Sequence, residues 1–303
     1  MLTNKPEKWQ KLPIYKMLTF HNLWNFLSNK YLTNFVKYQN DFLALVIHCS
    51  KIVKSPGDFV FKRDLEIDFE CAFLLNLIDD FLINLKPIEY ITNKRHFFGL
   101  DFYVDNRVLI PRNDTESVLA TFISHVGKFI TKDQYFLDLG TGSGCLAIAL
   151  SKQFSECSII ASDISKEALK VAKINQAKHS ANNVTLIQAN FLDVLKKINH
   201  HIDYLICNPP YVDTNDCHLE KGVRKHEPSI ALFANSRGLQ YYQLLFNELQ
   251  TNLDFQPKVI TCELHEYLAD QISFLANNLQ KKYNVTISLD LNQAKRAITL
   301  VKK

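Results

Sequence analysis

The chain lacks any apolar run long enough to cross a bilayer, which takes about 18 consecutive apolar residues. Its first residues, Met1 to Lys16, contain lysines but no apolar stretch behind them, so they do not resemble a secretion signal. The same segment carries Glu7 and no arginine, which argues against a mitochondrial presequence. We therefore expect a cytoplasmic protein with no membrane partner.

The sequence also lacks the cysteine pattern of a metal or dithiol site. None of its seven cysteines forms a CxxC pair, and most of them lie in apolar runs. Such cysteines are typical of reduced core thiols in a cytosolic protein. The ten histidines show no metal-ligand spacing either, and His200 and His201 are expected in a solvated loop. We expect no metal site.

Charge of one sign is not in large excess. The 303 residues include 35 Lys and Arg against 31 Asp and Glu, for a net charge of +4 and a pI of about 8.5. Nucleic-acid-binding domains usually have a pI above about 9 with clustered basic residues. Hydrophobic residues make up 47% of the chain, as in an ordinary globular protein of one large or two modest domains. We expect a monomer without a direct nucleic-acid partner.

The first part of the chain, residues 1–86, is predicted to be a helical domain. Apolar residues recur there at helical spacing over 23–46 and again over 70–85. Ser55 to Asp58 is expected to be a turn between helices. Residues 87–112 differ, because 97–104 alternates like a strand and 108–110 is a second short apolar run before Pro111. This pattern predicts a β-hairpin that links two domains.

Residues 113–303 alternate between strands and helices, which predicts an α/β domain with a doubly wound, mostly parallel sheet. The last two strands have no helix between them and should pair antiparallel. The predicted strands are 135–139, 158–161, 183–188, 202–207, 259–264, 285–289 and 297–301, and the predicted helices are 145–154, 165–178, 239–249 and 271–281.

A glycine-rich turn joins the first of these strands to the first helix. Its sequence is Asp138-Leu139-Gly140-Thr141-Gly142-Ser143-Gly144. Glycines at alternate positions let the backbone turn tightly and approach a ligand, and the amides of the following helix favour negative groups. The spacing is GxGxG rather than GxGxxG, which favours a nucleoside without phosphates over a dinucleotide. A tight turn in any α/β protein is the alternative explanation.

Polar side chains also follow the next strands. Asp163 ends the second strand and can accept hydrogen bonds from both hydroxyls of a ribose. Asn190 and Phe191 follow the third strand, where an amide could meet an adenine amino group and a ring could cover the base. Because ligands of open α/β sheets bind beyond the carboxyl ends of the strands, these positions are expected to share one crevice with Asn208.

Asn208-Pro209-Pro210-Tyr211 follows the strand 202–207. The Asn side chain offers an acceptor oxygen, and the prolines keep their carbonyls but have no amide hydrogens. Such a corner suits a planar amino group that donates two hydrogen bonds, with Tyr211 packed on its face. The guest could be an amide or the exocyclic amino group of a base.

Together these residues resemble an S-adenosylmethionine-dependent methyltransferase that modifies a planar nitrogen. Further stretches narrow the resemblance to the peptide chain release factor glutamine N5-methyltransferases (the PrmC/HemK family). These stretches are Pro87 to Ile91, Phe98-Gly99, Val108 to Glu116, His218 to Arg224, Glu227-Pro228 and Ala231-Leu232. The resemblance runs from about residue 87 to the C-terminus, and it implies a Rossmann-like sheet.

The resemblance also implies residue roles. The residues implied to bind the cofactor are Gly140, Thr141, Gly142, Ser143, Gly144, Asp163, Asn190, Phe191 and Asn208. The residues implied to bind the substrate glutamine are Asn208, Pro209, Pro210 and Tyr211. Of these, Asn208, Pro209 and Tyr211 are implied to be catalytic. The implied cofactor is S-adenosylmethionine, which becomes S-adenosylhomocysteine, and the implied partner is a class I release factor, held in part by the helical domain. Thr115 and Glu116 are implied to lie near the cofactor, although helix capping would also explain them.

Three positions depart from the family pattern. Asn113 stands where the family often has Pro, Asn190 stands where it has an acidic residue, and no Gly follows Cys262 to Leu264. These departures concern cofactor affinity more than the reaction. Two other enzymes stay open as alternatives. One methylates a glutamine of a large-subunit ribosomal protein, and the other methylates adenine N6 in a flipped base of DNA or RNA.

Overall fold

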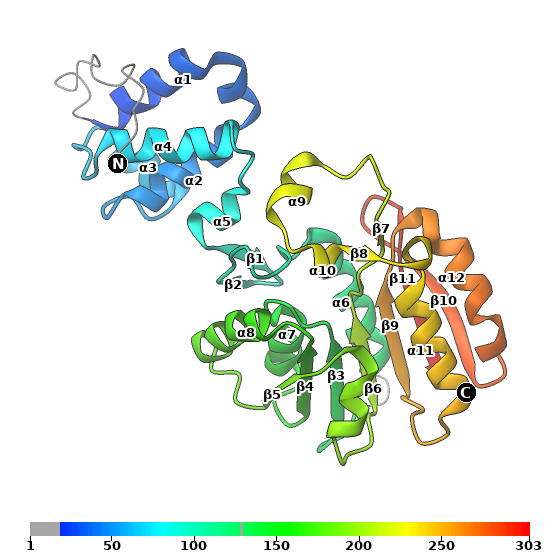
Figure 1. The fold of residues 1–303 in the computed structure, drawn as a ribbon. Helices are drawn as coiled ribbons and strands as arrows, with labels where there is room; N and C mark the ends of the chain where they lie inside the picture. Colours follow the sequence, from blue (N-terminus) through cyan, green and yellow to red (C-terminus); the bar gives the residue numbers. More distant parts are fainter. Residues whose placement is uncertain (1–18, 128–129) are drawn as a thin grey trace, which may run out of the picture. The chain divides into compact units, whose positions relative to one another are not determined.

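A computed structural model describes residues 19–127 and 130–303 of the chain (Figure 1). The expectation about Met1 to Lys16 lies outside the described residues. The chain divides into two compact units, one ending at Thr92 and one beginning at Asn93. No helix of the described residues is both long and apolar enough to cross a membrane.

The first unit is helical, as predicted, although its last helix lies in the stretch 87–112 that was predicted to be a β-hairpin linker. Its helices are α1 Phe20–Lys37, α2 Gln39–Cys49, α3 Pro56–Lys62, α4 Cys71–Leu82 and α5 Ile88–Thr92. They enclose a core of their own that includes Leu27, Phe42 and Ile78, each with no exposed surface. The turn expected at Ser55 to Asp58 is instead the start of α3, because the Ser55 side chain accepts a hydrogen bond from the Asp58 amide and caps that helix.

The second unit opens with a hairpin that is tighter than predicted. Its strands are β1 Arg95–Phe97 and β2 Leu100–Phe102, paired antiparallel. Phe98 and Gly99 both have positive φ, 48° and 77°, as a two-residue hairpin turn requires. The prediction of a strand at 108–110 is wrong. That segment pairs with no strand, and the Ile110 amide donates to Glu227 Oε2 at 3.1 Å.

The main sheet has seven strands in the order β10-β11-β9-β6-β3-β4-β5 (Figure 1). Neighbours from β9 to β5 run parallel, while β11 pairs antiparallel with both β9 and β10, as expected for the final strands. The strands are β3 Tyr135–Leu139, β4 Ser158–Asp163, β5 Val184–Gln188, β6 Tyr204–Cys207, β9 Val259–Glu263, β10 Tyr283–Leu289 and β11 Lys295–Lys302.

Helices cover both faces of this sheet, which confirms the doubly wound α/β prediction. Phe136 of β3 packs with α6 and α7 on one face, while Leu137 and Leu139 pack with α11 and α12 on the other. The alternation follows from the two-residue period of a strand. The helices are α6 Asn113–Val126, α7 Cys145–Gln153, α8 Lys166–Lys178, α11 Gln240–Thr251 and α12 Ala269–Leu275 (Figure 1).

Several short elements were not predicted. The segment after β6 contains β7 Val212–Asp213 and β8 Phe233–Ala234, which pair parallel, with α9 Lys221–His226 and α10 Ser229–Leu232 between them. The described residues of the second unit also form four 3₁₀ turns: η3 Phe191–Lys197, η4 Ser236–Gly238, η5 Glu266–Leu268 and η6 Ala276–Leu279. The helix predicted at 271–281 is thus α12 followed by η6. The segment with β7, α9, α10 and β8 comes directly after the carboxyl end of β6 in the chain.

Candidate active site

The four loops singled out in the sequence meet at one edge of the sheet. The glycine loop follows β3, Asp163 ends β4, Asn190 follows β5 and Asn208 follows β6. These strands are parallel neighbours, with Leu139 directly beside Cys207 in the register of β3 and β6. Adjacent strands lie about 4.8 Å apart. The glycine loop and the Asn208–Tyr211 tetrapeptide therefore start side by side.

The backbone of the glycine loop requires glycine. Gly140 and Gly142 have φ values of 75° and 53°, and a Cβ built on either would meet no atom within 4 Å. Space is thus open above both positions, and a ligand can approach the backbone there. Gly144 has a different role, since its Cβ would come within 3.1 Å of Ile148 Cδ1 and 3.3 Å of Ala172 Cβ. It permits α7 and α8 to pack closely.

Two buried polar atoms beneath this loop have no hydrogen-bond partner among the described residues. They are Oδ1 of Asp138 and Oγ of Ser143. The other Asp138 oxygen accepts from the Thr141 hydroxyl at 2.6 Å. Complete burial raises the pKa of Asp138 to about 7, against the lowering effect of the Thr141 hydrogen bond. Buried polar atoms normally have partners, so these two indicate a place for a polar ligand.

Asp163 is fixed to the glycine loop. Its Oδ2 accepts from the Gly142 amide at 2.9 Å and its Oδ1 from the Ser165 amide at 2.8 Å, which holds the carboxyl at the end of β4. Burial raises its pKa, while these amides lower it. The carboxyl keeps further lone pairs for hydroxyl donors.

The next loop brings an aromatic pair to the same edge. The Phe191 ring packs edge-on against Tyr241 of α11, with centroids 4.9 Å apart and planes at 68°. The sequence did not predict this position for Tyr241. In an apolar helix, a tyrosine that lies beside a loop residue and one that packs in the core give the same sequence pattern. Asn190 is exposed beside them.

The tetrapeptide lies in a crowded corner. Pro209 is buried, and Asn208, Pro210 and Tyr211 are half-buried. Asn208 Nδ2 donates to the Thr115 hydroxyl of α6 at 3.4 Å. The Tyr211 hydroxyl donates to Oε1 of Glu263, the last residue of β9, at 3.3 Å.

Gly238 packs directly behind the tetrapeptide. A Cβ on this residue would lie 2.3 Å from the Tyr211 carbonyl oxygen, so only glycine fits there. The sequence offered no signal for this role.

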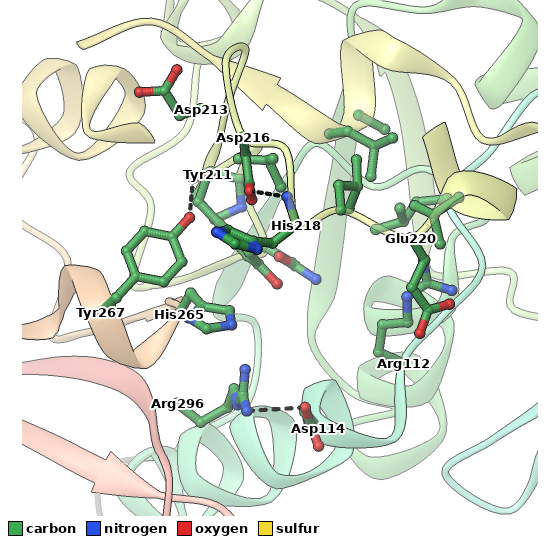
Figure 2. Close-up of a pocket in the computed structure, with 18 of the residues that line it drawn as sticks. Arg112, Asp114, Tyr211, Asp213, Asp216, His218, Glu220, His265, Tyr267 and Arg296 are labelled. Atoms are coloured by element: carbon green, nitrogen blue, oxygen red, sulfur yellow. Dashed lines mark hydrogen bonds and ion pairs between the residues drawn. The ribbon is translucent and has the colours of Figure 1, made fainter. Parts of the chain in front are cut away.

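A cavity of about 1090 Å³ opens in front of the tetrapeptide (Figure 2). Its lining includes Asn208, Pro209 and Tyr211, together with three arginines and four acidic residues: Arg95, Arg112, Arg296, Asp114, Asp213, Asp216 and Glu220. Neither Pro210 nor the glycine loop belongs to this lining among the described residues. Figure 2 shows Arg296 reaching across to Asp114 of α6, at 3.1 Å, and the Tyr267 hydroxyl at the Tyr211 carbonyl, at 3.4 Å.

Thr115 and Glu116, the two residues implied to lie near a cofactor, have separate contacts. Thr115 is buried beside Asn208. Glu116 Oε1 accepts a hydrogen bond from the Phe98 amide at 2.9 Å and so holds the hairpin turn. Across residues 19–127 and 130–303, no group of three His, Cys, Asp or Glu side chains is arranged to hold a metal ion.

Comparisons with known proteins agree with this geometry. The methyltransferase domain family matches residues 130–290. The release factor glutamine methyltransferase of Mycoplasma mycoides subsp. mycoides is 34% identical over 277 residues, which are 90% of this chain and 95% of that protein. The enzyme of the same name from Flavobacterium psychrophilum is 32% identical over 77% of this chain and 82% of its own length.

A solved structure shares the fold. The hMettl16 catalytic domain, determined in complex with MAT2A 3'UTR hairpin 6, superposes with a TM-score of 0.51 at 16% identity, over 77% of this chain and 93% of that one. At this identity the likeness concerns the fold alone. The identity to the two named enzymes extends over most of the chain. A glycine loop and an Asn-Pro-Pro-Tyr corner also follow adjacent strands, and we conclude that the chain belongs to the family of release factor glutamine methyltransferases.

Proposed function

We propose that this enzyme transfers a methyl group from S-adenosylmethionine to the side-chain amide nitrogen, N5, of the glutamine in the Gly-Gly-Gln motif of class I release factors. The observation that carries the proposal is the adjacency of the glycine loop and the Asn208–Tyr211 tetrapeptide on neighbouring parallel strands. A methyl donor bound over one and an amide held by the other would meet at the same edge of the sheet.

The residues around the glycine loop fit such a cofactor. Open space above Gly140 and Gly142 accommodates a ligand, and the unpaired Asp138 Oδ1 and Ser143 Oγ offer partners for its amino-acid part. Asp163 is placed for ribose hydroxyls, and Asn190 and Phe191 for the adenine. When bound, S-adenosylmethionine would supply a methyl group on a positively charged sulfur.

The tetrapeptide would orient the substrate amide. An amide nitrogen is a weak nucleophile because its lone pair is delocalised into the carbonyl. Asn208 Oδ1 and the Pro209 carbonyl would accept its two hydrogens, and the Tyr211 ring would pack against it. Such alignment can contribute about 7–11 kcal/mol to lowering a barrier. The two acceptors also stabilise positive charge that develops on the nitrogen, and the proton can leave after the methyl group is transferred.

The helical first unit is proposed to help hold the release factor, and the reaction is proposed to take place in the cytoplasm. Seven free cysteines support that location. Residues 1–90 contain 11 Lys and Arg against 10 Asp and Glu, which is not the basic arm that an adenine methyltransferase of DNA or RNA would need. The ribosomal-protein enzyme stays the nearer alternative.

Incubation of the purified enzyme with labelled S-adenosylmethionine and a purified release factor tests the proposal, followed by mass mapping of the product. We expect one methyl group on the glutamine of the Gly-Gly-Gln motif and none on a release factor with asparagine at that position. Large-subunit ribosomal proteins and duplex DNA, assayed in parallel, should stay unlabelled. Label on either of them, with an unmodified release factor, would overturn the assignment.

A further inference from the structure

The tetrapeptide leads directly into a long loop that forms much of the cavity wall. We call residues 212–234 the flap, which runs from the first residue of β7 to the last residue of β8 and contains α9 and α10 (Figure 1). Both halves of the flap contribute to the cavity lining, with Asp213 and Glu220 from the first half and Leu232 from the second. The position of the flap therefore determines the shape of the cavity.

Both ends of the flap meet at Tyr211. The strand β7 follows Tyr211 directly and pairs in parallel with β8. The turn η4 comes after β8, and its Gly238 lies so close to the Tyr211 carbonyl oxygen that a Cβ would be 2.3 Å from it. The base of the flap is thus fixed at the tetrapeptide.

The two halves of the flap are also bonded to each other. The Arg224 guanidinium of α9 donates to the Asp216 carbonyl and lies 5.2 Å from the centre of the Phe233 ring of β8. The Glu227 amide donates to the Val223 carbonyl at 3.0 Å, at the end of α9. These contacts all lie within the flap, so its position over the cavity depends on contacts with other segments.

One buried carboxylate joins the middle of the flap to another part of the cavity wall. Glu227 lies between α9 and α10, and only 1% of its side chain is exposed. Its Oε2 accepts from the Ile110 amide at 3.1 Å, and its Oε1 accepts from Arg112 Nη2 at 2.5 Å. A hydrogen bond between a guanidinium and a carboxylate is stronger than one between neutral groups. Glu227 thus attaches the flap to residues 110–112.

Residues 110–112 lead into α6, which begins at Asn113. Arg112 itself lines the cavity (Figure 2). In the first turn of α6, the Thr115 hydroxyl accepts from Asn208 Nδ2 at 3.4 Å. Glu227 therefore connects the flap to the start of the same helix that contacts the proposed acceptor of the substrate amide.

We propose that Glu227 is a positioning residue for the release factor, which holds the flap through Ile110 and Arg112 and so shapes the cavity before the substrate enters. This inference rests on the proposed function, because it takes the cavity as the place of the release-factor segment that carries the glutamine. A wall that is already ordered spares the substrate the cost of ordering it on association. Glu227 does not act on the amide, because Asn208 and Tyr211 keep contacts of their own.

The test compares Glu227→Gln with a matched control, Asp203→Asn. Glutamine keeps the size of the side chain and an acceptor for the Ile110 amide, but it loses the charge that pairs with Arg112. Asp203 has partners of the same kind, the Tyr135 amide at 3.0 Å and Lys258 Nζ at 2.9 Å, but it precedes β6, at the opposite end of that strand from the tetrapeptide. We expect the KM of the release factor to rise at least about 10-fold in Glu227→Gln and to stay within about twofold of wild type in Asp203→Asn.

The comparison of KM with kcat separates positioning from a merely structural role. A loss of folded enzyme lowers the apparent kcat and leaves KM unchanged. A displaced flap instead raises KM, while kcat and the Kd of the cofactor should stay within about threefold of wild type. An unchanged KM in folded Glu227→Gln would overturn the proposal.

Hydrogen–deuterium exchange reports on the flap without any methylation. Peptides from residues 212–234 should exchange at least about 10-fold faster in Glu227→Gln than in the wild type or in Asp203→Asn, while peptides from β3 and β4 should exchange as in the wild type. Equal exchange of the flap in all three proteins would also overturn the proposal. If the wild type does not methylate the release factor, the proposed function fails, whereas the exchange data still decide whether Glu227 holds the flap.

Arg112→Gln covers the case in which Glu227→Gln does not fold. The Arg112 side chain is 36% exposed, so water can take the place of the lost guanidinium. This variant removes the same charged contact from the other side, and the flap should again exchange at least about 10-fold faster. Where both single variants fold, the KM of the double variant should lie within about twofold of the larger single effect. Wild-type exchange of the flap in Arg112→Gln, or fully additive effects on KM, would contradict a connection through Arg112.

Discussion

Asp138 is a carboxyl group without solvent contact at the base of the glycine loop. Its pKa is about 7 in the folded protein, because burial outweighs the Thr141 hydrogen bond, and 3.8 is its ordinary value. Between these values the unfolded chain has released the proton while the folded protein keeps it. Stability contributed by this group is therefore complete below about pH 4 and is lost as the pH rises through about 7.

We expect Asp138→Asn to remove this dependence. Between about pH 5 and about pH 8, the Tm of the wild type should fall relative to that of Asp138→Asn, as followed by calorimetry without cofactor. Burial also raises the pKa of Glu263 to about 7. Because Glu263 is present in both proteins, its effect cancels in the difference between their Tm values. A constant difference in Tm over this range would show that Asp138 does not keep its proton in the folded state.

Single residues also show what sequence reasoning can reach. Asn208 and Asp163 were identified because each stands directly after an apolar strand, where a polar side chain must face a ligand or solvent. Glu263 also ends a strand, but its hydrogen bond with the Tyr211 hydroxyl joins two residues that are distant in the sequence and meet only in the fold. Glu116, which was implied to lie near the cofactor, accepts a hydrogen bond from the hairpin turn, and its place beside a cofactor stays a prediction.

At the scale of elements, the position of the tetrapeptide depends on η4. Gly238 ends this turn with φ of 88°, and its missing Cβ leaves room for the Tyr211 carbonyl oxygen. Gly238→Ala must therefore move either η4 or the tetrapeptide. The positive φ alone costs about 1 kcal/mol.

Activity and stability of Gly238→Ala can be compared with those of Gly57→Ala. We expect Gly238→Ala to lower both the free energy of unfolding and the rate of methylation. Gly57 lies in α3, where a Cβ would meet only Ser55 Oγ at 3.8 Å. Gly57→Ala should thus stabilise the chain by about 0.5–1 kcal/mol in denaturant unfolding and leave methylation unchanged. Full activity of Gly238→Ala would mean that the tetrapeptide does not depend on η4.

Long elements were predictable and short ones were not. The strands of the main sheet carry continuous apolar runs, because both faces are covered by helices, and these runs are visible in the sequence. By contrast, β7 and β8 have two residues each, which is too short for any periodic signal. The hairpin prediction failed at 108–110, since the turn at Phe98-Gly99 closes the pairing within residues 95–102.

At the scale of the whole molecule, the two units have separate cores. The buried residues of the first unit, from Phe20 to Ile91, form one cluster, and both clusters of the second unit begin beyond Asn93. The glycine loop, the tetrapeptide and the cavity all belong to the second unit. Cofactor binding should accordingly need only that unit, whereas the proposed grip on the release factor also needs the first.

Deletion of residues 1–92 tests this division. We expect the remaining 93–303 chain to bind S-adenosylmethionine with a Kd within about threefold of the full chain, by calorimetric titration. Its KM for the release factor should rise at least about 10-fold, which corresponds to about 1.4 kcal/mol of lost contacts. An unchanged KM would remove the helical unit from substrate recognition.

The family could be predicted from the sequence because its motifs lie at the carboxyl ends of neighbouring strands. There a few consecutive residues are enough to indicate which ligand the loop binds. The large cavity with its three arginines could not be predicted, because Arg95, Arg112 and Arg296 come from distant parts of the chain and converge only in the folded unit.

The central claim is that Asn208 holds a glutamine amide beside the methyl donor. Its most direct test is the methylation rate of Asn208→Ala on a purified release factor, measured together with the Kd of the cofactor and the Tm. We predict a protein that stays folded, binds the cofactor more weakly and methylates at least about 10²-fold more slowly, as when one preorganised polar partner is lost. Turnover near that of the wild type would contradict the account.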